Sequence, residues 1–171
     1  MAIVHSFTPV ADPGCRVLIL GSMPGKLSLE QQQYYAHPQN LFWPFMGELF
    51  GILPSLPYEQ RRSQLIMHQV AVWDVLQECF RSSSLDGDIE EASIIANDFT
   101  LFFSAHPNLQ YVFFNGSKAE QAYQRHVLKK QRIPATLQYK KLPSTSPANA
   151  SIPRAIKLAQ WQAVRQAVDS L

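Results

Sequence analysis

The hydrophobic pattern of this sequence alternates between short apolar runs and longer stretches with helical spacing. Arg16-Val-Leu-Ile-Leu20 is apolar on both faces and ends at Gly21, as expected for a buried central strand. Three similar runs follow along the chain: Val70-Ala-Val-Trp-Asp74, Gln110-Tyr-Val-Phe-Phe114 and Thr136-Leu-Gln-Tyr-Lys140. The pattern therefore predicts four strands, and the first of them is central.

Helical signals lie between the strand-like runs. A short polar residue followed three positions later by Glu has the form of a capping box, and such a pair occurs twice. The candidate helices are residues 41–50 after a possible cap at Asn40, residues 58–69, the two capping boxes Asp88-Ile-Glu-Glu91 and Ser117-Lys-Ala-Glu120, and an amphipathic stretch from Ser151 to Leu171 with Pro153 in its first turn.

Strands that alternate with helices favour parallel pairing and right-handed crossovers. The predicted fold class is α/β, a three-layer α/β/α sandwich around a central, mainly parallel four-stranded sheet, formed by one domain over residues 1–171. Such sheets bind ligands in the crevice at the carboxyl ends of their strands. We therefore expect the functional site in the loops after Leu20, Asp74, Phe114 and Lys140.

Composition narrows the class of protein without identifying a partner. The chain has 171 residues, no run near the roughly 20 apolar residues of a membrane-spanning helix, and no secretory pattern in Met1 to Val10. Its two cysteines, Cys15 and Cys79, are too few for a disulfide framework, so a cytoplasmic location is expected. The net charge of +2 neither requires nor excludes nucleic acid.

The loop after the first predicted strand, together with the segment that follows it, concentrates candidate chemistry. Gly21-Ser-Met-Pro-Gly25 has two glycines and a proline, which suits a rigid turn where backbone approaches a ligand, although a plain strand-to-helix turn needs the same residues. Tyr35 and Asn40 lie in an aromatic and polar segment that would suit a pocket for a planar base. Phe42 and Trp43 fit the core of the next helix better, and Asn40 could be only its N-cap.

These residues resemble the first motif of hypoxanthine-DNA glycosylases, a branch of the uracil-DNA glycosylase superfamily. The likeness extends over Gly21-Ser-Met-Pro-Gly25, Ser28-Leu29, Tyr34-Tyr-Ala-His-Pro38 and Asn40-Leu-Phe-Trp43. Mismatch-specific uracil glycosylases have a similar Gly-x-Asn-Pro-Gly turn and Phe-Ala-His-Pro segment. Superfamily members commonly have a water-activating Asp or Asn within the glycine turn, where this chain has Ser22 and Met23. The resemblance to the hypoxanthine branch implies that Asn40 takes over this catalytic role.

Two further loops offer polar side chains at strand ends. Asp74 ends a predicted central strand, where a buried carboxylate needs a hydrogen-bond partner. It is either a salt-bridged or capping residue or a group that accepts from an N–H of a flipped base. Superfamily members place a base-reading amide near the end of the corresponding strand. Asn115-Gly-Ser117 indicates a turn and a helix cap, and Lys118 could add a phosphate contact.

The loop Leu142-Pro-Ser-Thr-Ser-Pro-Ala-Asn149 resembles the second superfamily motif, a Pro-Ser-rich loop that presses on the DNA backbone and fills the gap left by a flipped base. The resemblance implies DNA-binding roles here. Common uracil glycosylases begin this loop with His, whereas this chain has Leu142, so no histidine electrophile is expected and uracil is disfavoured as the main substrate. The candidate phosphate donors are Ser144, Thr145 and Ser146, and the candidates for entering the helix stack are Ala148 and Asn149.

These observations lead to the hypothesis that the protein is a DNA repair glycosylase. It would hydrolyse the N-glycosidic bond of a flipped, deaminated base, and hypoxanthine is the first candidate for that base. Tyr35 would stack on the base, and Ser22, Met23 and Asp74 would read its edge. Asn40 would position water. We expect a monomer that binds DNA containing a deaminated base, with no membrane and no cofactor. No metal is expected, because the histidines show no ligand spacing.

Three alternatives remain open from the sequence. One is a non-catalytic DNA-lesion-binding module, and another is a glycosylase for uracil, xanthine or an alkylated base. The third is a small-molecule hydrolase with Ser22 as nucleophile and His37 or His106 as base. Ser22 lacks the Gly-x-Ser-x-Gly frame of a nucleophile elbow, which disfavours this last alternative.

Overall fold

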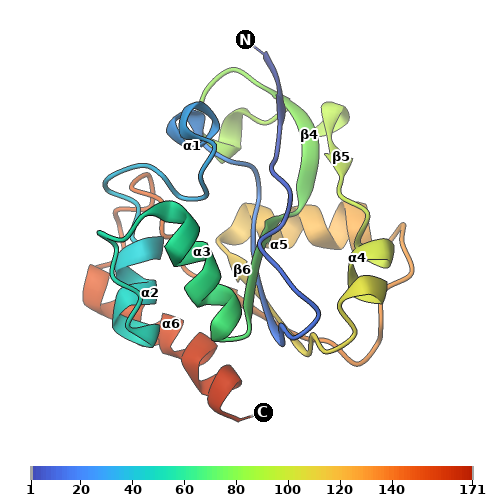
Figure 1. Ribbon diagram of the computed structural model, residues 1–171. Coiled ribbons are helices and arrows are strands. Elements are labelled where there is room, and N and C mark those ends of the chain that lie inside the picture. Colours follow the sequence, from blue (N-terminus) through green and yellow to red (C-terminus); the bar gives the residue numbers. More distant parts are fainter. Residues whose placement is uncertain (1, 171) are drawn as a thin grey trace.

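The computed structural model describes residues 2–170 and has a central parallel sheet of four strands (Figure 1). The strand order is β3-β2-β6-β7. Each predicted strand is present within two residues of its expected bounds. The strands are β2 (Val17–Gly21), β3 (Val70–Asp74), β6 (Tyr111–Asn115) and β7 (Gln138–Leu142). Three of them extend past the predicted end, because Gly21 pairs with Asp74 and Asn115 pairs with Leu142.

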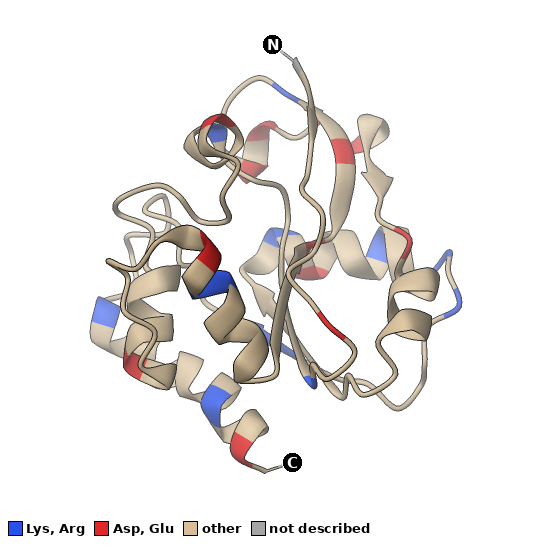
Figure 2. Ribbon diagram, in the orientation of Figure 1, with Lys and Arg blue, Asp and Glu red and all other residues tan. Residues whose placement is uncertain are grey.

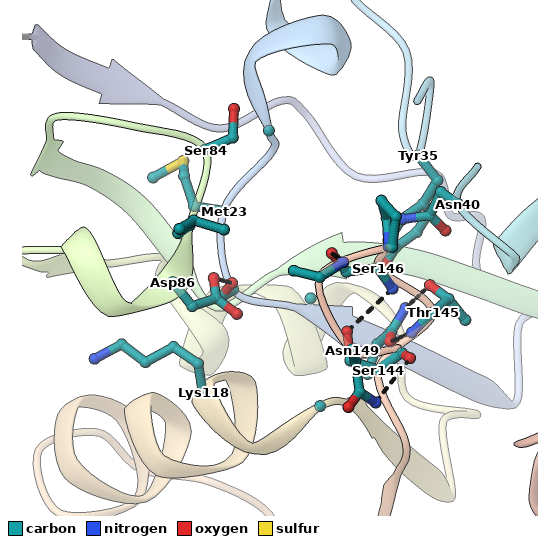
Figure 3. Close-up of a pocket in the computed structure, with 18 of the residues that line it drawn as sticks. Met23, Tyr35, Asn40, Ser84, Asp86, Lys118, Ser144, Thr145, Ser146 and Asn149 are labelled. Carbon is teal, nitrogen blue, oxygen red and sulfur yellow. Dashed lines mark hydrogen bonds between the residues drawn. The ribbon is translucent and has the colours of Figure 1, made fainter. Parts of the chain in front are cut away.

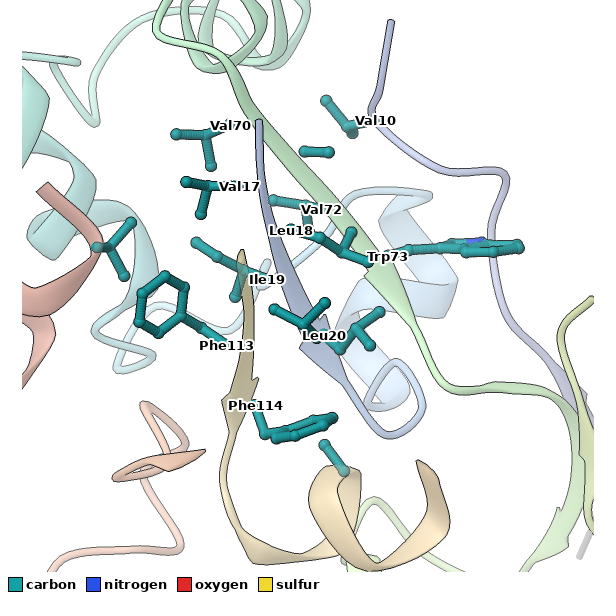
Figure 4. Close-up of a cluster of buried hydrophobic side chains, with 14 of the residues drawn as sticks. Val10, Val17, Leu18, Ile19, Leu20, Val70, Val72, Trp73, Phe113 and Phe114 are labelled. Carbon is teal, nitrogen blue, oxygen red and sulfur yellow. The ribbon is translucent and has the colours of Figure 1, made fainter. Parts of the chain in front are cut away.

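The inner part of the sheet is covered on both faces, which explains the apolar runs there, whereas four of the five residues of the edge strand β7 are exposed. All five residues of β2 are buried, and so are all five of β3 (Figure 4). On one face, Trp161 of α6 (Arg154–Asp169) packs edge-on against Phe42 of α2 (Phe42–Phe50). On the other, Trp73 packs on two phenylalanines of α4 (Phe99–Ala105), and Phe114 packs on Tyr123 of α5 (Ser117–Tyr123). The predicted three-layer arrangement is confirmed.

Most of the predicted helices form at the expected places. The expected end of the last predicted helix, Leu171, lies outside the described residues. Helices α1 and α4 were not predicted. The six α-helices within residues 2–170 are α1 (Lys26–Gln31), α2 (Phe42–Phe50), α3 (Tyr58–Met67), α4 (Phe99–Ala105), α5 (Ser117–Tyr123) and α6 (Arg154–Asp169). A short π-helical segment, η3 (Gln124–Leu128), continues α5. None of the helices in the described part of the chain is long and apolar enough to cross a membrane.

The predicted capping boxes differ in outcome. Ser117 begins α5 as its first helical residue, but the N-cap is Gly116 and no side chain caps it. The prediction at Asp88 was wrong, since only two short 3-10 turns form there, η1 (Asp86–Asp88) and η2 (Glu91–Ser93). The backbone of this segment pairs with the neighbouring strand instead, through an Arg81–Ile89 bridge and the Glu90 N–H to the Phe80 carbonyl.

A second, antiparallel sheet was not predicted. It contains β1 (Ala2–His5), β4 (Leu76–Arg81) and β5 (Ile95–Ala96) in the order β1-β4-β5. Strand β4 begins one residue after β3 ends, with Val75 between them. The chain therefore leaves the carboxyl end of the central sheet in extended form and continues along one side of the expected site.

Candidate active site

The loops at the carboxyl ends of the central strands surround one cavity of about 1140 Å³ (Figure 3). This volume slightly exceeds the roughly 300–1,000 Å³ of common small-molecule sites, so a base with part of its sugar-phosphate backbone can enter. All of the site residues that the sequence singled out line this cavity: Ser22, Met23, Tyr35, Asn40, Asp74, Ser144, Thr145, Ser146, Ala148 and Asn149. The topology thus brings together segments more than 100 residues apart.

The glycine turn, residues 21–25, lies against two side chains at the inner end of the cavity. A Cβ on Gly21 would lie 2.6 Å from Asp74 Oδ1 and 3.0 Å from the Tyr35 hydroxyl oxygen, so this position requires glycine. The backbone N–H groups of Ser22, Met23 and Gly25 have no hydrogen-bond acceptor among residues 2–170. They are therefore available to a ligand.

Ser22 itself is engaged by a carboxylate. Its hydroxyl donates to Asp86 Oδ1 at 2.5 Å. His37 Nδ1 accepts the backbone N–H of Gln39, and His106 is absent from the cavity lining, with Nδ1 2.7 Å from the Phe102 carbonyl. Within the described chain no histidine bonds the Ser22 hydroxyl. This geometry disfavours a serine hydrolase.

Asp74 is a buried carboxyl group, only 3% exposed. Its Oδ2 has no hydrogen-bond partner within residues 2–170, and no ion pair involves it there. Burial raises the pKa of Asp74 to about 8, the nearby Asp86 carboxylate adds to this rise, and Arg81 opposes it. Asp74 is thus mostly protonated at neutral pH and can donate a hydrogen bond as well as accept one.

Tyr35 completes the inner wall of the cavity. Its backbone is left-handed, with φ of 56°, and its ring stacks on Phe42 with centroids 4.1 Å apart. Its hydroxyl is buried and lacks a hydrogen-bond partner in the described residues, and burial raises its pKa well above the usual value. One ring face is occupied by Phe42, so a stacked base would have to use the other face.

Asn40 combines a structural role with a place in the cavity. Its Oδ1 accepts the backbone N–H of Phe42, the first residue of α2, at 2.9 Å. Its Nδ2 donates to no protein acceptor in the described part of the chain. The next residue, Leu41, donates its backbone N–H to the Thr145 carbonyl at 3.0 Å. The amide is thereby fixed between helix α2 and the last loop, with donor capacity to spare.

The last loop, residues 142–149, is anchored at several points. Asn115 Nδ2 donates to Thr145 Oγ1 and the Thr145 N–H donates to Asn115 Oδ1, both at 2.9 Å. From α6, Trp161 Nε1 donates to the Pro143 carbonyl, and Lys157 Nζ donates to the Asn149 carbonyl. The tip of the loop, at Pro147 and Ala148, is exposed.

The placement of Thr145 does not suit the phosphate contact expected from the sequence. It is only 1% exposed and its hydroxyl binds Asn115. Ser144 and Ser146 are half-buried. Their hydroxyl oxygens accept backbone N–H groups of the loop, at 3.2 Å in each case, which leaves their own protons for a phosphate oxygen. Thr145 thus anchors the loop, and its neighbours remain candidates for DNA contact.

Replacing Asn115 with alanine should loosen this loop and destabilise the fold by about 2–3 kcal/mol, because it leaves two buried groups of Thr145 without partners. Chemical denaturation measures the change. Asn108→Ala is the matched control, since its exposed amide makes one bond to the Pro13 carbonyl. Equal, small losses in both variants would contradict the anchoring role.

Comparison with known proteins identifies the family. The family model described as the uracil DNA glycosylase superfamily matches residues 8–167. The chain belongs to the uracil-DNA glycosylase superfamily. This confirms the resemblance seen in the two motifs, and it makes the protein a DNA glycosylase whose substrate is DNA.

Named relatives lie in one branch of this superfamily. The chain is 39% identical to a hypoxanthine DNA glycosylase of Methanosarcina barkeri over 116 residues, covering 67% of this glycosylase and 72% of the relative. It is 33% identical to a hypoxanthine DNA glycosylase of Methanosarcina acetivorans, covering 95% and 98%. A solution NMR structure from M. acetivorans, provisionally described as a uracil DNA glycosylase, is 32% identical over 98% and 99% of the chains, with a TM-score of 0.81.

The Lys and Arg residues of this glycosylase are scattered over several helices and loops of the ribbon in Figure 2. Lys118 lines the cavity, but its Nζ lies 2.8 Å from Glu91 Oε2. Arg125 and His126 bind the other oxygen of Glu91. Hydrogen bonds from Lys118 and His126 lower the pKa of Glu91 to about 2. A phosphate contact by Lys118 would therefore compete with Glu91.

The segment from the end of β4 through η1, residues 81–88, was not predicted to be part of the site. Three of its side chains contact the glycine turn or the residue after it. Arg81 Nη2 donates to the Pro24 carbonyl at 2.6 Å, and Ser84 Oγ accepts the Lys26 N–H at 2.9 Å. Asp86 accepts the Ser22 hydroxyl. In the sequence, the serines and the Asp86-Gly87 pair of this segment indicate a loop. Their spacing does not indicate that strand β4 precedes this loop.

Proposed function

We propose that this glycosylase hydrolyses the N-glycosidic bond of hypoxanthine in DNA and releases the free base. The observation that carries the proposal is the single cavity in which the glycine turn, Asn40 and the last loop meet. Two relatives that bear the name hypoxanthine DNA glycosylase support the choice of base. The absence of a histidine at Leu142, which is buried, also points away from uracil as the main substrate.

Access to the cavity requires that the nucleotide rotates out of the duplex. This costs a few kcal/mol and is cheapest for a mispaired base, so mispairing contributes to selection. The exposed tip at Pro147 and Ala148 can enter the space that the nucleotide leaves. Ser144 and Ser146 would hold the adjoining phosphates, with the prolines keeping the loop stiff.

The inner end of the cavity suits the charge that develops on the base. When the C1′–N bond breaks, its electron pair goes to the base, which becomes negative. The unpaired N–H groups of Ser22, Met23 and Gly25 and the protonated carboxyl of Asp74 are all donors that can bind this charge. Tyr35 would stack on the ring.

Asn40 would position the attacking water. Its Oδ1 has a second lone pair beside the bond to Phe42, and its Nδ2 is unpaired in the described residues. An amide is too weak a base to remove a proton, so its contribution is orientation. The water oxygen bonds to C1′ as the base departs, and the proton leaves to solvent or to the base.

The enzyme is proposed to be monofunctional, acting as a monomer in a reducing cytoplasm. Strand-cleaving glycosylases need an amine nucleophile. Of the lysines that line the cavity, Lys118, which is labelled in Figure 3, is held by Glu91. The two free, buried cysteines suit a reducing compartment.

Oligonucleotides with one deoxyinosine or one deoxyuridine, opposite each normal base, test the function. We expect release of hypoxanthine, with intact strands until hot alkali cleaves the abasic site. Strand breaks without alkali would refute the monofunctional mechanism. Release of uracil alone would keep the superfamily chemistry and overturn the proposed substrate.

A further inference from the structure

A buried cation lies beneath the glycine turn. Arg81, at the end of β4, is only 3% exposed. Its Nη2 donates to the Pro24 carbonyl at 2.6 Å. Its Nε and Nη1 are buried and bind no acceptor in the part of the chain that the structure describes. A guanidinium with two unpaired donors is rare inside a protein and calls for a physical explanation.

The charge of Arg81 is not neutralised by a direct ion pair. No carboxylate of the described residues lies within salt-bridge distance of it. Asp74, the buried carboxyl of the same site, is mostly protonated at neutral pH. Asp86 is exposed and binds the Ser22 hydroxyl. Arginine keeps its proton even where burial lowers its pKa, so a positive charge remains buried behind the glycine turn, and its one hydrogen-bond partner among residues 2–170 is the Pro24 carbonyl.

One peptide group connects this charge to the cavity. The Pro24 carbonyl and the Gly25 N–H belong to the same peptide, and both residues line the cavity. A hydrogen bond from a cation to the carbonyl polarises the peptide and strengthens its N–H as a donor. The Gly25 N–H has no acceptor among residues 2–170 and is therefore available to a ligand.

We propose that Arg81 is a positioning residue that stabilises the negative charge of the departing base, acting through the Pro24–Gly25 peptide and through its buried positive charge. The inference rests on the proposed base release. Arg81 would supply positive charge to a site whose last loop begins with Leu142 rather than a histidine. Before the bond breaks, the unpaired cation is a cost to the fold, and the anion formed during the reaction offsets that cost.

Three substitutions separate the charge from the hydrogen bond. Arg81→Lys keeps a charged donor, Arg81→Gln keeps a neutral donor for the Pro24 carbonyl, and Arg81→Met removes both. We expect the single-turnover rate of hypoxanthine release to fall about 100-fold in Arg81→Gln and Arg81→Met, and less than about tenfold in Arg81→Lys. Arg165→Gln is the matched control, because that arginine also donates to a backbone carbonyl, at Leu49, outside the cavity.

Affinity for DNA is measured in parallel with an uncleavable 2′-fluoro-deoxyinosine duplex. We expect it to change less than about threefold, because the charge acts only once the base becomes negative. Wild-type rates in Arg81→Gln, or equal losses in the lysine and glutamine variants, would overturn the inference. So would a loss confined to affinity, or a failure of both neutral variants to fold while the lysine variant folds.

The proposed function and the inference fail in different ways. If the wild type releases uracil but no hypoxanthine, the proposed substrate is wrong, and the same variants assayed on deoxyuridine decide the role of Arg81. If the wild type releases hypoxanthine and Arg81→Gln matches it, only the inference is wrong. If the wild type releases neither base, both are wrong.

Discussion

Asn40→Ala should lower the single-turnover rate of base release by about 10²–10³-fold, which is the scale of losing one oriented catalytic group. The side chain lines the cavity, and it is the residue to which the superfamily resemblance assigns the water. The same substitution removes the hydrogen bond to the Phe42 N–H, which should cost about 1 kcal/mol of stability. The rate must therefore be measured on folded protein, at saturating enzyme.

Asn40→Ser separates the two roles of this residue. A serine hydroxyl can accept the same backbone N–H, so thermal stability should stay close to that of the wild type. The amide is gone, however, and the rate should remain low. If Asn40→Ala stays within tenfold of the wild-type rate, another group positions the water and the assignment of Asn40 is incorrect.

Asp74→Asn should abolish the alkaline limb of the pH profile. If the protonated carboxyl of Asp74 donates to the base, the wild-type rate falls as pH rises through about 8, roughly tenfold per pH unit beyond it. An asparagine amide keeps a donor at every pH, so the variant should lose this limb and exceed the wild type above pH 9. Single-turnover rates between pH 6 and 10 provide the measurement.

Stability should change in the same pH window. The pKa of Asp74 is raised in the folded state from 3.8 to about 8, so the folded protein binds a proton that the unfolded chain releases. This contribution is complete below about pH 4 and is lost as pH rises to about 8. Between pH 6 and pH 9 the wild type should lose about 2–3 kcal/mol through Asp74, and Asp74→Asn should not.

Urea denaturation of both proteins at pH 6 and pH 9 measures this difference. Asp12→Asn is a suitable control, because that side chain lies outside the cavity and binds the Gly14 backbone. Parallel pH dependence in the wild type and Asp74→Asn, in both rate and stability, would show that Asp74 does not carry the titration.

Much of the fold could be predicted because burial leaves a direct mark on the sequence. Strands covered on both faces read as short apolar runs, and β2 and β3 are buried at every position. The parallel arrangement then places the loops at one edge of the sheet, which was enough to gather Tyr35, Asn40 and Asp74 into one cavity. Their chemistry could be inferred only by adding the family resemblance.

Other features depend on packing that no local pattern records. In the run Ser144-Thr-Ser146 the three hydroxyls look equivalent, and only the contact with Asn115 shows that Thr145 lies inside. From the sequence alone, Asn115 was interpreted as a turn residue. Arg81 and Asp86 approach the glycine turn because β4 belongs to a second sheet, whose strand β1 is more than 70 residues away in the sequence. No spacing of residues predicts such an approach.

The hydrogen bond from the Leu41 N–H to the Thr145 carbonyl joins the segment that holds Asn40 to the loop that faces the DNA. Thr145 is in turn bound to Asn115 at the end of the central strand β6. These links join the exposed loop and the segment that holds Asn40 into one hydrogen-bonded unit. If a duplex presses on the exposed tip as proposed, these few bonds would carry the displacement to the backbone next to Asn40, and insertion of the loop would be coupled to alignment of the water.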